Sequence, residues 1–112
     1  MSGAVHVTEA EGALLEALWR CGPLSPRGLV AEVQRARPWG QATIKTLLAR
    51  LMHKRVVRAQ REAGALRYHP LVERQAFVES EVAALAERLF GGDLAALAAF
   101  ASECARKLPA RA

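Results

Sequence analysis

Hydrophobic residues recur with helical spacing in five stretches of the chain, and two short stretches between them have strand character. The most regular helical stretch is residues 40–55, where the intervals are three and four. Its apolar positions are Ile44, Leu47, Leu48 and Leu51. This spacing predicts a helix that buries one face.

The opposite face of this helix is small, polar and free of acidic residues. The centre of this face is formed by Ala42, Thr46, Ala49 and His53. Its flanks are formed by Thr43, Lys45 and Arg50. Small residues with cations at the edges let a helix approach a polyanion closely, as a helix that reads the DNA major groove must. An amphipathic core helix that happens to be basic is the alternative interpretation.

Two shorter helices are predicted before this one. Residues 8–11 fit a capping box at a helix start, and the Gly-Pro pair at 22–23 ends that helix. The Ser-Pro pair at 25–26 begins the second helix. Because residues 37–40 then turn the chain into the third helix, the sequence predicts a helix-turn-helix.

A two-stranded hairpin is predicted directly after the third helix. Residues 56–61 and 66–69 have strand character, and Pro70 ends the second strand. The turn at residues 62–65 contains Gly64, which favours positive φ. Three helices followed by a hairpin predict a winged helix-turn-helix over residues 8–70.

The remaining chain, residues 71–112, is predicted to be helical with a break at residues 91–92. Its apolar positions form two stripes. The first is Val78, Val82, Leu85 and Leu89, and the second is Leu94, Leu97, Ala101, Cys104 or Ala105, and Leu108; Phe100 is also expected at the dimer contact. Two amphipathic helices this short would leave apolar faces exposed in a monomer. We therefore expect a helical dimerisation region, and a mainly α fold with one small β-hairpin.

Composition and charge distribution support this division. The chain has 112 residues, 52% of them hydrophobic but only 5% aromatic, and a formal charge of +5. Residues 35–67 contain nine Lys or Arg and one Glu, whereas residues 71–112 contain five cations and six acids. A basic middle beside a nearly neutral tail is typical of a nucleic-acid-binding head joined to an interaction region.

Several functional classes are not supported. No Ser-His-Asp set, carboxylate pair or phosphate-binding glycine loop can be assembled, so we expect no catalysis and no cofactor. His6, His53 and His69 lack ligand spacing, which argues against a metal site. Cys21 and Cys104 are expected to be two buried thiols in a reducing cytosol. With no leader or long apolar segment, we expect a cytoplasmic protein without membrane insertion.

The chain resembles the bacterial penicillinase-repressor family, the BlaI, MecI and CopY-like regulators. The matching pieces are residues 8–19, Trp39, residues 43–51, residues 68–72 and residues 90–92. The most specific piece is Thr-x-x-Thr-Leu-x-x-Arg-Leu at residues 43–51. The resemblance implies a homodimeric transcriptional repressor on inverted-repeat operators, commonly of β-lactamase or metal-resistance genes.

By match to the family's reading helix, Thr43, Lys45 and Thr46 are expected to face bases. The residues expected along the DNA backbone are Trp39, Gln41, Arg50, His53, Lys54, Arg55, Arg58, Arg61 and Arg67. For Trp39, core packing and an indole hydrogen bond to phosphate are both open.

The resemblance also implies how repression is relieved. Family members are often inactivated by a membrane-sensor pathway that ends in cleavage before a Phe in the C-terminal region. The corresponding bond here is Ala99–Phe100, with Ala99 where the family usually has Asn. The copper-responsive branch has closely spaced C-terminal cysteines, whereas Cys104 stands alone.

Two other functions remain as alternatives. One is a protein-interaction adaptor that keeps the winged-helix shape and binds a partner through its helical region. The other is a regulator that responds to a small ligand, which needs an apolar pocket. The acid-free face of the third helix favours DNA binding over both.

Overall fold

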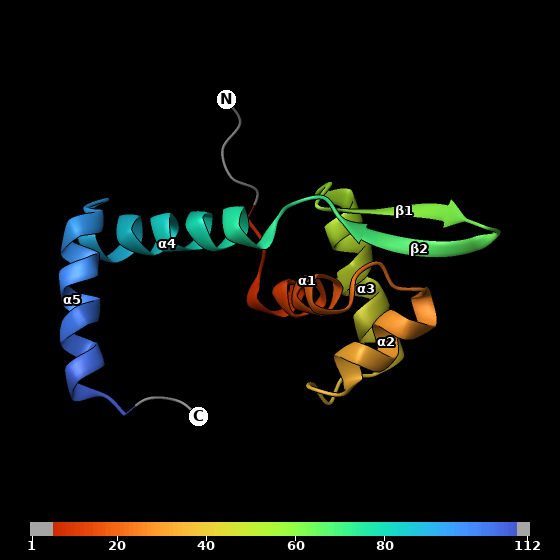
Figure 1. The fold of residues 1–112 in the computed structure, drawn as a ribbon, viewed down its shortest axis with the longest axis horizontal. Helices are drawn as coiled ribbons and strands as arrows, with labels where there is room; N and C mark the ends of the chain where they lie inside the picture. The colour runs from red at the N-terminus through yellow and green to blue at the C-terminus, as the bar shows by residue number, and fades with distance from the viewer. Residues whose placement is uncertain (1–5, 110–112) are drawn as a thin grey trace. The chain divides into compact units, whose positions relative to one another are not determined.

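The computed structural model describes residues 6–109, and in it the chain forms two units (Figure 1). We call residues up to Arg74 the head and residues from Gln75 onward the arm. The elements are α1 (Glu9–Cys21), α2 (Pro26–Gln34), α3 (Gln41–His53), β1 (Val57–Glu62), β2 (Ala65–Pro70), α4 (Arg74–Phe90) and α5 (Leu94–Lys107). The mainly helical fold with one hairpin is as predicted, and each unit is described by itself.

The helices of the head begin where the capping residues predict. The Thr8 hydroxyl accepts a hydrogen bond from the Glu11 amide, and the Glu11 carboxylate accepts one from the Thr8 amide, each at 3.1 Å. At the start of α2, the Ser25 hydroxyl accepts from the Gly28 amide at 3.0 Å. Gly22 ends α1 with φ of 81°, a conformation that glycine adopts without strain.

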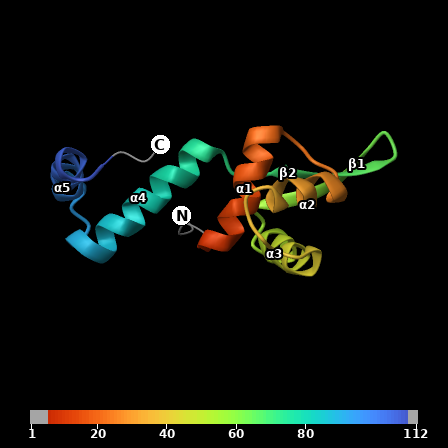
Figure 2. The ribbon, with the colours of Figure 1, turned by 90° about the horizontal axis from the view of Figure 1, so that it is seen from below.

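The core of the head lies where α1, α2 and α3 meet, and the hairpin packs beside them (Figure 2). The large apolar side chains that are fully buried are Leu14, Leu15, Leu18, Leu29, Ile44, Leu51 and Val57. The apolar residues that are spaced i, i+3, i+4 in α3 therefore lie on the side of that helix that packs on α1 and α2. Every apolar residue of the predicted stripe in α3 is buried.

The wing is an antiparallel hairpin in which Val57 pairs with Pro70 and Glu62 with Ala65. Its turn is shorter than the predicted 62–65, because only Ala63 and Gly64 remain unpaired and both have positive φ. A two-residue turn of this kind matches the twist of the strands it joins.

An isolated bridge beside the wing was not predicted from the sequence. Leu24, in the segment between α1 and α2, forms a bridge with Tyr68 on β2. The Tyr68 amide donates to the Leu24 carbonyl at 2.8 Å, and the Leu24 amide donates back at 3.3 Å. A single bridging residue has no periodicity, so hydrophobic patterning could not reveal it.

The arm consists of α4 and α5, joined at Gly91 and Gly92. Asp93 caps α5 by accepting a hydrogen bond from the Ala96 amide, and the Phe90 and Phe100 rings lie 5.8 Å apart. The large apolar residues that stay exposed in the arm are Val78, Val82, Leu89, Leu94, Phe100 and Leu108. The predicted apolar stripes are thus largely open to solvent.

The expectation of two buried thiols is wrong. Cys21 is exposed and Cys104 is half-buried. Cys21 is the last residue of α1, where the helix ends at the surface, and Cys104 lies on α5, which has no buried residue. Free cysteines are usually buried, which is why burial was expected. The spacing of apolar residues in α5 did not show which side of this helix would be covered.

Replacing Leu51 by Ala should lower the free energy of unfolding of the head by about 2–5 kcal/mol, because Leu51 is fully buried and its loss leaves a cavity. Leu71→Ala is the matched control, since Leu71 is 49% exposed and should lose less than about 1 kcal/mol. Urea unfolding of both variants measures the difference. Equal losses would contradict the packing described here.

Candidate nucleic-acid interface

The face of α3 opposite the core is exposed along its length. The three predicted base-reading residues, Thr43, Lys45 and Thr46, are all exposed. In the part of the chain that the structure describes, none of them makes a side-chain hydrogen bond or ion pair. Their polar groups are therefore available to a partner, as direct readout of base edges requires.

The N-terminus of α3 adds polar groups at one end of this face. Gly40 occupies the N-cap position without a side chain, so no side chain caps the first amides of α3. Gln41 is exposed in the first turn. Uncapped amides and the positive end of the helix dipole favour a phosphate oxygen at this end.

Arg27 is a cation near this end that sequence reasoning missed. It is exposed and lines a hollow between α2 and α3 together with Gln41 and Lys45. The sequence held no signal for it, because Arg27 follows Pro26 in the first turn of α2 and its approach to α3 depends on how the helices pack.

The wing carries the next group of predicted cations. Arg58 and Arg61 are exposed, whereas Arg67 is half-buried. Arg61 donates a long hydrogen bond of 3.4 Å to the Gly64 carbonyl at the turn. The wing's one acid, Glu62, lies 2.7 Å from the His69 ring, so it is not paired with any of these arginines.

Arg55 stands at the corner between α3 and the wing in an unfavourable backbone conformation. Its φ is 63°, which lies in the left-handed region. The Val56 amide donates a hydrogen bond to the Leu51 carbonyl at 3.0 Å, and this bond closes the C-terminal end of α3. Glycine is the usual residue there, and a side chain costs roughly 1–2 kcal/mol. The chain therefore keeps an exposed cation at this corner at the expense of stability.

Trp39 lies in the turn before α3 and is half-buried. The Arg37 guanidinium stacks 4.8 Å from the centre of its ring, and Arg37 also pairs with Glu9. The Arg37 hydrogen bond and charge lower the pKa of the exposed Glu9 carboxyl below its usual value. Within residues 6–109 the indole N–H of Trp39 makes no hydrogen bond, so its contact with phosphate stays a prediction.

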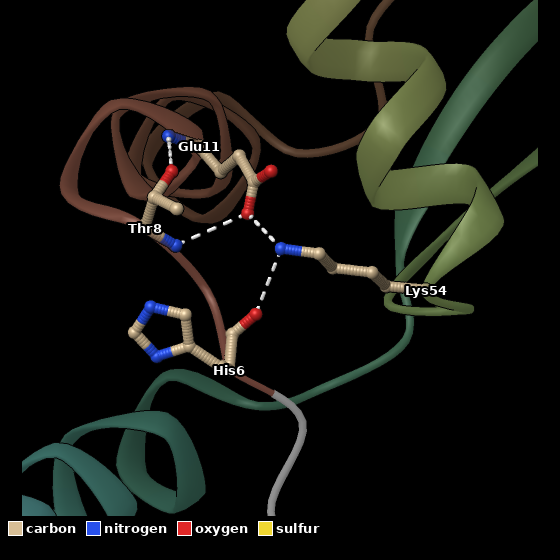
Figure 3. A network of polar contacts seen from close by, with 4 residues as sticks. All are labelled: His6, Thr8, Glu11 and Lys54. Atoms are coloured by element: carbon tan, nitrogen blue, oxygen red, sulfur yellow. Dashed lines mark hydrogen bonds and ion pairs between the residues drawn. The ribbon is translucent and has the colours of Figure 1, made fainter.

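Lys54 differs from the other predicted backbone contacts, because its charge is compensated inside the head (Figure 3). Its ammonium lies 2.6 Å from the Glu11 carboxylate and 2.9 Å from the His6 carbonyl oxygen. Burial of Glu11 acts to raise the pKa of its carboxyl, but Lys54 and Thr8 outweigh burial and hold that pKa below its usual value. A contact of Lys54 with phosphate stays a prediction, and in this structure its charge is already paired with Glu11.

The other predicted DNA contacts on α3 and the candidate cleavage residues on α5 are exposed as well. Arg50 and His53 are exposed on α3. Ala99 and Phe100, the candidate cleavage residues, are exposed near the middle of α5. Among residues 6–109, no three His, Cys, Asp or Glu side chains come together as a metal site, and no helix has the length and apolarity to cross a membrane.

A model of the penicillinase repressor family matches residues 7–110, which is almost the entire chain. The chain belongs to the penicillinase repressor family. The family model and some of its matched relatives are named as repressors.

Similar proteins agree with this membership. The penicillinase repressor of Bacillus licheniformis is 21% identical over 80% of this chain and 70% of its own length. The methicillin resistance regulatory protein MecI of Mammaliicoccus sciuri is 28% identical over 61% of this chain. An uncharacterised 16.5 kDa protein of Latilactobacillus sakei is 29% identical over 77% of this chain. This chain spans 59% of the L. sakei protein and 55% of MecI.

Two solved structures share the fold. One is monomeric BlaI of B. licheniformis in complex with the blaP half-operator, with a TM-score of 0.60 and 20% identity over 66% of this chain and 92% of that chain. The other is the DNA-binding domain of the repressor BlaI, with a TM-score of 0.57 and 22% identity over 66% and 90%. They establish the winged-helix fold for the 66% of this chain that each of them covers.

Arg55→Gly should raise the free energy of unfolding by about 1 kcal/mol, because glycine adopts the positive φ of this position without strain. Arg50→Gly is the matched control, because it makes the same substitution inside the helix that ends just before Arg55. Arg50 lies within α3, where glycine costs about 1 kcal/mol. Thermal or urea unfolding should therefore give changes of opposite sign, and a destabilised Arg55→Gly protein would contradict the strain assigned to this residue.

Proposed function

We propose that the chain is a sequence-specific transcriptional repressor that binds operator DNA as a homodimer on inverted repeats. Its targets are β-lactamase-type or other resistance genes. The observation that carries this proposal is the acid-free face of α3, which is exposed and holds Thr43, Lys45 and Thr46. The wing adds cations after the C-terminal end of this helix. Family membership and the half-operator bound by the similar BlaI structure support it.

In this proposal α3 enters the major groove, and its small central residues let the backbone approach the bases. Thr43 and Thr46 offer hydroxyls that donate and accept, and Lys45 donates to acceptors on guanine or thymine. The phosphate contacts come from the cations around this face: the exposed Arg50, Arg55, Arg58 and Arg61, the half-buried Arg67, and His53 at the end of α3. These contacts fix the position of the head on the duplex, whereas the threonines supply specificity.

The arm supplies the second half of the proposal, with a second copy of this chain as the occupant of its apolar surface. Val82 is 41% exposed, Leu89 62% and Phe100 59%. Few residues inside the arm cover these side chains, and exposed apolar surface of this kind marks an interaction site. A twofold pair of arms would place two heads on the two halves of an inverted repeat.

Relief of repression is proposed to follow the family pattern, in which a membrane-sensor pathway leads to cleavage of the arm in the cytoplasm. The candidate bond, Ala99–Phe100, is exposed but helical. A protease needs the chain to open locally at such a bond. Cleavage there would divide α5 and remove part of the apolar surface that holds the dimer.

The direct test is selection of duplexes from a random DNA library by the purified protein. The account predicts recovery of a sequence with two inverted halves. Recovery of no preferred sequence would reject specific DNA binding, and recovery of a single, asymmetric site would reject the twofold arrangement.

Two substitutions should separate phosphate contact from base readout. Arg61→Ala should weaken binding to all sequences and reduce the slope of log affinity against log salt by about one, since one phosphate contact is lost. Thr46→Val should instead lose discrimination at one base position, at roughly 1–3 kcal/mol. Fluorescence anisotropy over a salt series, with single-base variants of the selected duplex, measures both effects.

Arg20→Ala is the control for charge alone. Arg20 lies on α1, and its charge is compensated by Glu32 at 3.0 Å. Its removal should leave the affinity and the salt slope almost unchanged. If Arg20→Ala and Arg61→Ala behaved alike, the wing would not be a specific contact surface.

Val82→Glu should weaken the dimer, because it places a charge at the centre of the apolar surface of α4. Glu81→Lys is a control on a neighbouring exposed position outside the apolar stripe. Sedimentation equilibrium should show a more dissociated Val82→Glu protein and an unchanged control. A wild-type protein that is monomeric at all concentrations would rule out the proposed arm dimer.

A further inference from the structure

Glu11 is the one buried charged side chain among residues 6–109, with 1% of its surface exposed. Its carboxylate accepts hydrogen bonds from the Lys54 ammonium at 2.6 Å and from the Thr8 amide at 3.1 Å. The same ammonium donates to the His6 carbonyl at 2.9 Å (Figure 3). Three segments therefore meet at one ion pair: the residues before α1, the first turn of α1 and the end of α3.

This ion pair is joined to the C-terminal end of α3 through the Lys54 side chain. Lys54 is the C-cap residue, and its amide donates to the Arg50 carbonyl at 2.9 Å. With its ammonium held by Glu11 and by the His6 carbonyl, Lys54 ties the last turn of α3 to the start of α1. That turn holds Arg50 and His53, both on the exposed face.

The other contacts between α1 and α3 are apolar. Leucine side chains such as Leu14 and Leu51 provide burial, but apolar contact has no preferred direction and permits small rotations. A part-buried ion pair with several hydrogen bonds adds little net stability relative to an apolar pair, but its hydrogen bonds favour one arrangement of donor and acceptors. The Glu11–Lys54 pair is thus suited to fix an angle between two helices.

We propose that the Glu11–Lys54 ion pair holds α3 at the orientation in which its exposed face meets the bases. Glu11 and Lys54 are positioning residues that act through α3 and do not touch DNA. This inference rests on the proposed DNA-binding function and adds two residues to it. It also explains why a cation at the end of a basic helix is turned away from the exposed face.

The probe for the test is the duplex that the wild-type protein selects from a random library, with a scrambled duplex of equal length for comparison. Glu11→Gln keeps the size of the side chain and the capping box but removes the charge. On electrostatics alone, loss of an acid strengthens binding to DNA. The positioning role predicts the opposite: affinity for the selected duplex falls on the order of tenfold, while affinity for the scrambled duplex does not fall.

Lys54 variants complete the test. Lys54→Met should also weaken binding to the selected duplex without changing the salt slope, because no phosphate contact is lost. The double variant with Glu11→Gln should bind about as well as the weaker single variant, since both changes break one interaction. Lys54→Arg keeps the charge and should retain most of the affinity. All measurements are made where circular dichroism shows each variant to be folded, so loss of stability alone does not change the affinity.

Two results would overturn the inference while leaving the proposed function intact. One is a Glu11→Gln protein that binds the selected duplex as tightly as the wild type, or more tightly. The other is a Lys54→Met protein whose salt slope falls by about one, which would make Lys54 a phosphate contact. If Glu11→Gln does not fold, Lys54→Met and Lys54→Arg decide the question alone. A wild-type protein that selects no duplex overturns the proposed function together with this inference.

Discussion

Helix α3 must bury one side in the core and keep its opposite side open to solvent, and the structure of the head depends on this constraint. The apolar side of α3 is buried against α1, α2 and the wing, while its other side stays exposed and without intramolecular partners among the described residues. Burial supplies the stability, and an open polar side gives none. A side that contributes no stability yet consists of small residues and cations is best explained by a partner that binds it.

The charges of the head are arranged so that the cations near this side remain uncompensated. Most acids of the head are engaged elsewhere, in the pairs Glu9–Arg37, Glu11–Lys54, Glu16–Arg74, Glu32–Arg20 and Glu62–His69. Lys45, Arg50 and Arg58, by contrast, have no ion pair among the described residues. The positive field thus results from where the acids are placed as much as from the number of cations.

Local patterns predicted most of the fold, because caps, apolar periodicity and turn residues act within a few positions. The capping box at Thr8 and the buried stripe containing Ile44 and Leu51 are confirmed. What the sequence could not show depends on contacts between distant segments. The Glu11–Lys54 pair joins residues 43 apart, and Arg27 approaches α3 only through helix packing. The exposed face of α3 was predicted from periodicity, whereas its contacts with bases and phosphates stay predictions.

The central claim is that the exposed face of α3 and the wing form the surface that meets DNA. The most direct measurement is a titration of the labelled protein with its selected duplex, followed by amide NMR spectra. The account predicts the largest shifts at residues 41–55 and 57–70, with small shifts in α5. Shifts concentrated in the arm or on the exposed side of α1, with α3 unchanged, would contradict it.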